Sequence, residues 1–68
     1  MKFTIEFERE DDGRWIAEVT ELPGVLAYGS SPDEAIAHAK ALALRVIADR
    51  MESDEQSSQM TEIVFATL

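Results

Sequence analysis

The sequence predicts an α+β fold, a single β-β-β-α-β domain in which one helix packs on a sheet of four strands. Three observations predict this fold. Two N-terminal runs alternate apolar and polar residues with the period of two that is typical of half-buried strands. A helix-start signal precedes a long stretch with apolar residues at helical spacing. A run rich in β-forming residues follows that stretch.

The first two predicted strands, residues 3–7 and 15–20, should form an antiparallel hairpin across a turn at residues 10–13. Gly13 can adopt the positive φ that such a turn requires. If the large apolar side chains share the buried face, that face carries Phe3, Ile5, Phe7, Trp15, Ala17 and Val19. The opposite face then carries Glu6, Glu8, Ile16 and Glu18. We therefore expect the second face of the sheet to be acidic.

A turn and a short third strand follow the hairpin. Pro23 sets φ for the second turn position, and Gly24 is free to adopt the conformation that the third position needs. Residues 25–28 then form a strand that ends at Gly29. This strand brings the chain to the start of the helix.

The helix should begin at Pro32 and end at about Met51 or Glu52. Ser31 can cap it, Pro32 suits a first helical position where no N–H is needed, and Glu34 completes a capping box. The stripe expected to pack on the sheet contains Ala35, Ile36, Ala39, Leu42, Ala43, Val46 and Ile47.

A second apolar stripe lies on roughly the opposite side of this helix, and it contains Ala37, Ala41, Leu44, Ala48 and Met51. A solvent-facing helix surface normally carries charged residues, so the positions Ala37, Ala41, Leu44 and Ala48 are a candidate oligomer interface. The alternative is that alanine is simply a good helix former on an inert surface. A chain of 68 residues builds only a small core, which favours a homo-oligomer, a dimer or higher.

The end of the sequence completes the predicted order. Residues 53–59 are polar and form a connecting loop, and residues 61–66 form the final strand. No composition shift marks a second domain.

The charge of the chain favours some classes of partner and disfavours others. Six Lys and Arg against fourteen Asp and Glu give a net charge of −8, which disfavours direct nucleic-acid binding and favours a basic protein partner. The alternative is that this charge only keeps the domain soluble. Without cysteine, signal peptide or membrane span, we expect a cytoplasmic protein that does not associate with membranes.

The sequence offers little for catalysis, and we expect neither an enzyme nor a cofactor. His38 is the only histidine, and no second metal ligand or partnered nucleophile accompanies it. Glu6, Glu8 and Glu18 on one sheet face could hold Mg²⁺ for hydrolysis, although alternating glutamates are also typical of a solvated face. A metal-dependent carboxylate hydrolase is therefore kept only as a second alternative.

Residues 12–25, DGRWIAEVTELPGV, and residues 29–35, GSSPDEA, resemble the HicB antitoxin family, and the similarity extends from about residue 2 to residue 66. The family motif corresponds to Leu22, Pro23, Gly24, Gly29, Glu34 and Ala35. Val25 stands where many relatives have Cys, and Ser30 replaces a frequent acidic residue.

The resemblance implies a partial RNase H-like fold in a single domain, residues 1–68. Many relatives continue into a segment that binds operator DNA, and in this short member we expect no C-terminal DNA-binding domain. It implies a mixed sheet with strands in the order third, second, first, fourth, the last parallel to the first. It also implies an antitoxin that neutralises a small basic HicA-type RNA-cleaving toxin. The main alternative is an orphan protein-binding or regulatory module that acts as a homo-oligomer. We expect the toxin to contact an acidic surface made of Glu6, Glu8, Asp11, Asp12, Glu18 and Glu21.

Overall fold

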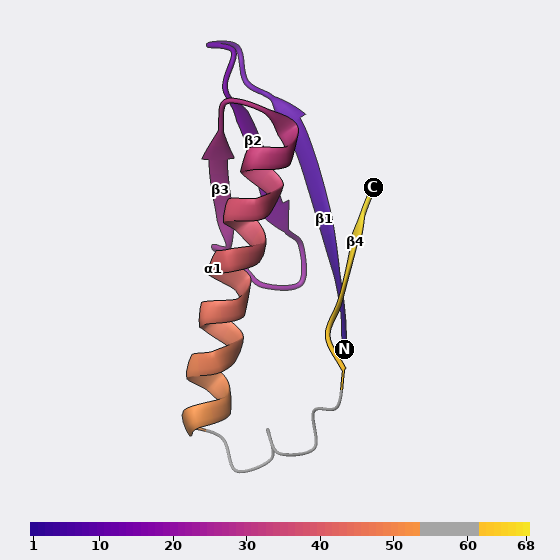
Figure 1. Ribbon diagram of the computed structural model, residues 1–68, viewed down its shortest axis with the longest axis vertical. Helices are drawn as coiled ribbons and strands as arrows, with labels where there is room; N and C mark the ends of the chain where they lie inside the picture. Colours follow the sequence, from indigo (N-terminus) through magenta and orange to yellow (C-terminus); the bar gives the residue numbers. More distant parts are fainter. Residues whose placement is uncertain (54–61) are drawn as a thin grey trace.

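The computed structural model describes residues 1–53 and 62–68 and has the predicted element order. One helix lies across a four-stranded sheet (Figure 1). The elements are β1 (Lys2–Arg9), β2 (Trp15–Val19), β3 (Leu26–Gly29), α1 (Pro32–Ser53) and β4 (Val64–Thr67). The α+β fold class is therefore confirmed.

The sheet has the order β3-β2-β1-β4, which is the order that the resemblance implies. β2 pairs antiparallel with both β1 and β3, whereas β4 runs parallel to β1. Figure 1 shows β4 beside β1, on the side of the sheet away from β3. The chain therefore passes along α1 before its last strand joins the first.

The register of the hairpin confirms the predicted sorting of side chains. Ile5 lies opposite Val19, and Glu6 lies opposite Glu18. Since successive side chains in a strand point to opposite faces, the odd-numbered residues of β1 and β2 face the helix and the even-numbered ones face away. One face of the sheet therefore belongs to the core and the other is open.

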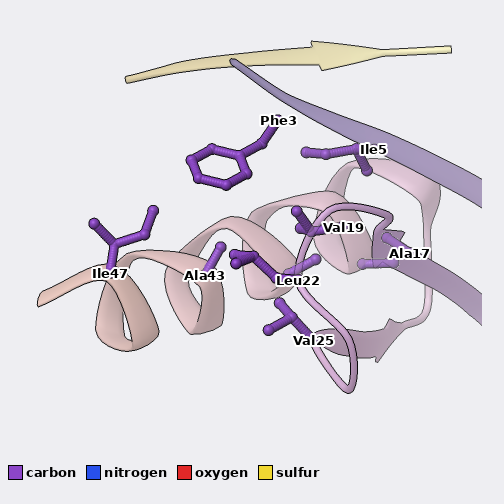
Figure 2. Packing of buried hydrophobic residues seen from close by; sticks show 10 residues of the cluster. Phe3, Ile5, Ala17, Val19, Leu22, Val25, Ala43 and Ile47 are labelled. Carbon is purple, nitrogen blue, oxygen red and sulfur yellow. The ribbon is translucent and has the colours of Figure 1, made fainter. Parts of the chain in front are cut away.

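The core lies between α1 and one face of the sheet. It contains Phe3, Ile5, Ala17, Val19, Leu22, Val25, Ala35, Ala39, Ala43 and Ile47. Figure 2 shows the sheet residues and the helix residues of this cluster pointing toward one another. The helix contributes three fully buried alanines, so its backbone can approach the strands closely.

Phe7 departs from the predicted core. It lies on the helix side of β1 but is 37% exposed, and its ring centroid is 6.3 Å from that of Trp15. The helix packs mainly on β2 and β3 and less on β1. Phe7 therefore shares the correct face of the sheet but lies beyond the cover of the helix.

The start of α1 is built by side chains, partly as predicted. Ser31 Oγ accepts a hydrogen bond from the Glu34 backbone N–H at 3.1 Å, which is the expected cap. The Glu34 carboxylate, however, accepts from the backbone N–H and the hydroxyl of Ser30, at 3.3 and 3.0 Å, rather than from the N–H of Ser31. Ser30 offers the carboxylate two donors at once, so the reciprocal half of the predicted capping box begins one residue earlier.

Every element has a boundary that differs slightly from the prediction, and those of β3, α1 and β4 have a local explanation or bear on the predicted loop. β3 begins at Leu26 because Val25 still belongs to the turn, where its N–H donates to Leu22 O at 3.0 Å. The helix extends to Ser53, whose hydroxyl donates to Asp49 O at 3.0 Å. β4 begins at Val64, and the predicted loop at residues 53–59 lies outside the described residues except for its first residue.

Candidate functional site

The open face of the sheet carries the carboxylates that the sequence placed there. Glu6 and Glu8 come from β1, and Glu18 comes from β2 directly opposite Glu6. All three side chains are exposed. Because α1 packs on the other face, no helix lies between these carboxylates and the solvent.

A shallow hollow of about 390 Å³ lies on this face. Its lining consists of Glu6, Phe7, Glu8, Ile16, Glu18 and Leu68. The Phe7 side chain lies on the helix side of β1, so the hollow combines three acidic residues with the apolar side chains of Ile16 and Leu68. Such a surface can accept a side chain that has an aliphatic stem and a cationic head, as lysine and arginine do.

The carboxylates of this hollow have no internal counter-ion. Within residues 1–53 and 62–68, the structure contains one ion pair, between Arg14 Nε and Asp12 Oδ2 at 2.7 Å, and it involves none of the three glutamates. Like charges directly opposite each other on neighbouring strands are unfavourable. The pair Glu6 and Glu18 would therefore gain from a cation supplied by another molecule.

Asp11 and Asp12 lie apart from the hollow, in the turn between β1 and β2. Asp12 accepts hydrogen bonds from the Arg14 backbone N–H at 3.0 Å and from Arg14 Nε at 2.7 Å. The pKa of Asp12 lies below its ordinary value of 3.8, mainly because of the hydrogen bond from the Arg14 backbone N–H. The Arg14 guanidinium lowers it further by a smaller amount. The Arg14 guanidinium also lies 4.4 Å from the centroid of the Tyr28 ring. Asp12 therefore holds an internal partner in the turn.

Glu21 lies beyond the end of β2 and ties two strands together. Its Oε1 accepts hydrogen bonds from the Thr4 backbone N–H at 2.7 Å and from the Thr20 hydroxyl at 3.1 Å. The Thr4 N–H is the main reason that the pKa of Glu21 lies below its ordinary value of 4.5. The six predicted contact residues thus occupy three separate places, and only Glu6, Glu8 and Glu18 share the hollow.

Apolar residues on the same open face were not predicted as part of the site. Tyr28 lies opposite Ile16 and Leu26 opposite Glu18, so both point to the open side of β3. Both are exposed, as is Leu68 beside β1. The period of two in the third strand could have placed Leu26 and Tyr28, but the position of Leu68 depends on the pairing of β4.

The second helix stripe lies on the outer side of α1. Ala37, Ala41, Leu44 and Ala48 are all exposed, and 46% of the Leu44 surface is accessible. The proposed interface of these residues stays a prediction.

His38 is exposed, as expected for a surface residue, and its Nδ1 lies 3.0 Å from Tyr28 O. A carbonyl oxygen only accepts, so Nδ1 carries the proton in this hydrogen bond. His38 therefore connects α1 with the outer strand β3.

The six residues of the motif that resembles the HicB family lie in the core, in a turn or at the start of α1. Leu22 and Ala35 are buried, and Pro23 and Gly24 form the turn before β3, where Gly24 has φ of +85°. Gly29 contacts the start of α1, where a Cβ would meet the Ala35 backbone N and lie 2.9 Å from Glu34 C. These residues shape the backbone rather than a chemical site.

Two further findings concern the described part of the chain. It contains no group of three or more His, Asp or Glu side chains arranged to hold a metal ion. No helix in this part of the chain combines the length and the apolar content that a membrane crossing requires.

Comparisons of the chain with protein-family models, with curated proteins and with solved structures found no match.

Proposed function

We propose that this chain binds and neutralises a small basic protein, a HicA-type RNA-cleaving toxin, as the antitoxins that its motifs resemble do. One observation carries the proposal: Glu6, Glu8 and Glu18 line an exposed hollow and form no ion pair with any cation of residues 1–53 and 62–68. The partial RNase H-like character of the fold and the cytoplasmic location belong to the same proposal. No cofactor takes part in it.

Charge supports a basic partner. The chain has a net charge of −8, which accelerates the approach of a positively charged protein. A protein that cleaves RNA must attract phosphates and therefore presents basic residues on its working surface. An acidic face that pairs with those residues occupies the surface that RNA needs, and this competition is the mechanism of neutralisation.

The apolar residues of the hollow provide the rest of the contact. Ile16 and Leu68 line it, and Leu26 and Tyr28 extend the same face across β3. Burial of this area adds a contribution that salt does not screen, whereas the carboxylates set the orientation of the partner.

The first experiment is a pull-down of the tagged chain from its native host. We expect a small basic protein to co-purify and to cleave RNA only after the tagged chain is stripped away. Recovery of the chain alone, as a homo-oligomer without latent ribonuclease, would contradict the proposal in favour of the orphan module.

A pair of charge-matched variants tests the surface itself. In Glu6→Gln/Glu18→Gln the binding constant for the toxin should fall about tenfold or more, because two desolvated carboxylates lose their cations. The control Asp49→Asn/Glu52→Gln removes the same charge from exposed positions on α1 and should change binding less than about threefold. Equal losses in both variants would mean that only net charge matters.

A metal titration tests the hydrolase alternative. We expect calorimetry to detect no heat of Mg²⁺ binding. We also expect the wild type to have no hydrolytic activity, so Glu6→Gln should change nothing in that assay. Saturable Mg²⁺ binding that depends on Glu6 would restore that alternative.

A further inference from the structure

The two edges of the sheet differ in how their backbone groups are used. In β3, every second residue forms backbone hydrogen bonds with β2. The residues between them, Leu26 and Tyr28, point their backbone N–H and C=O groups outward, away from β2. Tyr28 O is occupied by the hydrogen bond from His38. His38 therefore occupies one of the backbone groups through which a further strand could pair with this edge.

Among the described residues, no side chain bonds to the outward backbone groups of the β4 edge. The Val64 N–H donates to Met1 O at 2.8 Å, and the Leu68 N–H donates to Ile5 O at 3.0 Å. In a parallel ladder, the backbone groups of every second residue bond to the neighbouring strand. Since Val64 and Leu68 bond to β1, the N–H and C=O groups of Phe65 and Thr67 point outward, away from β1. Among the described residues these outward groups have no hydrogen-bond partner.

The side chains of this edge are suited to association. Residues 63–68, IVFATL, contain no charge and no proline, although the chain as a whole has a net charge of −8. Val64 is 41% exposed and Leu68 is 74% exposed. Exposed edge strands usually carry charges or proline that prevent pairing, and β4 has neither.

We propose that β4 pairs antiparallel with β4 of a second copy of this chain, across a twofold axis at Ala66. Phe65 of each copy then lies opposite Thr67 of the other, and their outward N–H and C=O groups form mutual hydrogen bonds. Val64 lies opposite Leu68 of the second copy on the open face, so two exposed apolar side chains cover each other.

The absence of charge on β4 favours a second copy over a basic partner as the occupant of this edge. Two strongly acidic chains repel each other where their carboxylates come close. Residues 63–68 contain no Asp or Glu, so pairing through β4 brings no carboxylate side chains of this segment together. The twofold at Ala66 also places the Glu62 residues at opposite ends of the paired segment. A basic partner, in contrast, would find no carboxylate within residues 63–68.

The pairing joins two sheets into one continuous sheet with both helices on the same side. Both hollows at Glu6, Glu8 and Glu18 stay on the opposite side. The two surfaces share Leu68, but the three glutamates take no part in the β4 pairing. A loss of self-association in Thr67→Pro can therefore be distinguished from a loss of toxin binding in Glu6→Gln/Glu18→Gln.

Sedimentation velocity from micromolar to millimolar concentration tests the proposal. The mass of the wild type should rise from 7.6 kDa toward twice that value. Thr67→Pro removes an outward N–H that makes no bond to residues 1–53 or 62–68, so we expect a native circular dichroism spectrum and a dissociation constant at least about tenfold weaker. The control Leu44→Lys alters the outer face of α1 and should dimerise as the wild type does.

Several outcomes would overturn the proposal. One is a wild type that stays monomeric at every concentration, and another is a Thr67→Pro variant that dimerises normally. Loss of the dimer in Leu44→Lys alone would move the interface to α1. If Thr67→Pro fails to fold, hydrogen exchange of the wild type decides: the Phe65 and Thr67 amides should gain protection with concentration, and unchanged protection there would refute the pairing.

Discussion

At Gly29, β3 closely approaches the start of α1. A Cβ at this position would meet the Ala35 backbone N and lie 2.9 Å from Glu34 Cβ. These contacts are with backbone and with the first carbon of a side chain, so rotation of a flexible side chain cannot relieve them. Gly24 differs, because nothing lies within 4 Å of its Cβ position and only its φ of +85° is unfavourable for other residues.

We expect Gly29→Ala to lower the free energy of unfolding by about 3 kcal/mol, because the helix start must move away from β3. Gly24→Ala is the matched control and should cost about 1 kcal/mol from its positive φ alone. Urea unfolding followed by circular dichroism measures both. A smaller loss in Gly29→Ala than in Gly24→Ala would contradict the close packing at β3.

Glu21 predicts a pH dependence of stability. Its folded-state pKa lies below 4.5, so the carboxylate stabilises the fold above that pH, and the contribution is lost as the pH falls through the folded-state pKa. Glu21→Gln should therefore melt below the wild type at neutral pH, and the gap should close at acidic pH. Thermal unfolding from about pH 7 to about pH 3 tests this expectation. A gap that keeps its size across the range would show that the hydrogen bond to Thr4 does not depend on charge.

At the scale of elements, α1 has two alanine-rich faces with opposite environments. Ala35, Ala39 and Ala43 are fully buried against the sheet, whereas Ala37 and Ala41 are exposed. The same residue type therefore has two roles. On the inner face a small side chain sets the distance between helix and sheet, and on the outer face it supports helix formation.

Enlarging one alanine on each face separates the two roles. Ala39→Leu should lower the free energy of unfolding by about 1–3 kcal/mol, because the added atoms have no space between α1 and the strands. Ala41→Leu, on the same helix, should stay within about 0.5 kcal/mol of the wild type. Urea unfolding at a low protein concentration compares them. Equal effects would contradict the assignment of the two faces.

At the scale of the whole molecule, the acidic charge opposes compaction. The net charge is −8, and the described residues contain one ion pair. Self-repulsion of this kind destabilises a folded chain at low ionic strength. The same charge that favours a basic partner therefore lowers the stability of the free domain.

Salt should stabilise the isolated chain. Raising NaCl from about 0.01 M to about 1 M shortens the screening length from about 30 Å to about 3 Å. We expect the free energy of unfolding to rise by on the order of 1 kcal/mol, which raises the melting temperature by about 4–8 °C in a domain of this size. Asp49→Asn/Glu52→Gln removes two negative charges and should show a smaller rise. A melting temperature that falls with salt would mean that attractive ion pairs dominate.

The local patterns of the sequence determined the elements and their faces. Alternation at Phe3 and Ile5 and at Ala17 and Val19 identified the buried side of the hairpin, because side chains in a strand point to the two faces in turn. Ser31 and Pro32 identified the start of α1, because capping uses side chains next to the first turn. The same alternation placed the three glutamates of the hollow on the open face.

Only the tertiary structure decided which of these features meet. The carboxylate of Glu21 bonds to Thr4, Phe7 extends beyond the cover of α1, and Leu68 lines the hollow beside Glu6. Each depends on how far one element extends across another, and no local pattern encodes that distance. Periodicity in a sequence assigns a side chain to a face, whereas its neighbours on that face depend on strand pairing and helix placement, which join residues far apart in the chain.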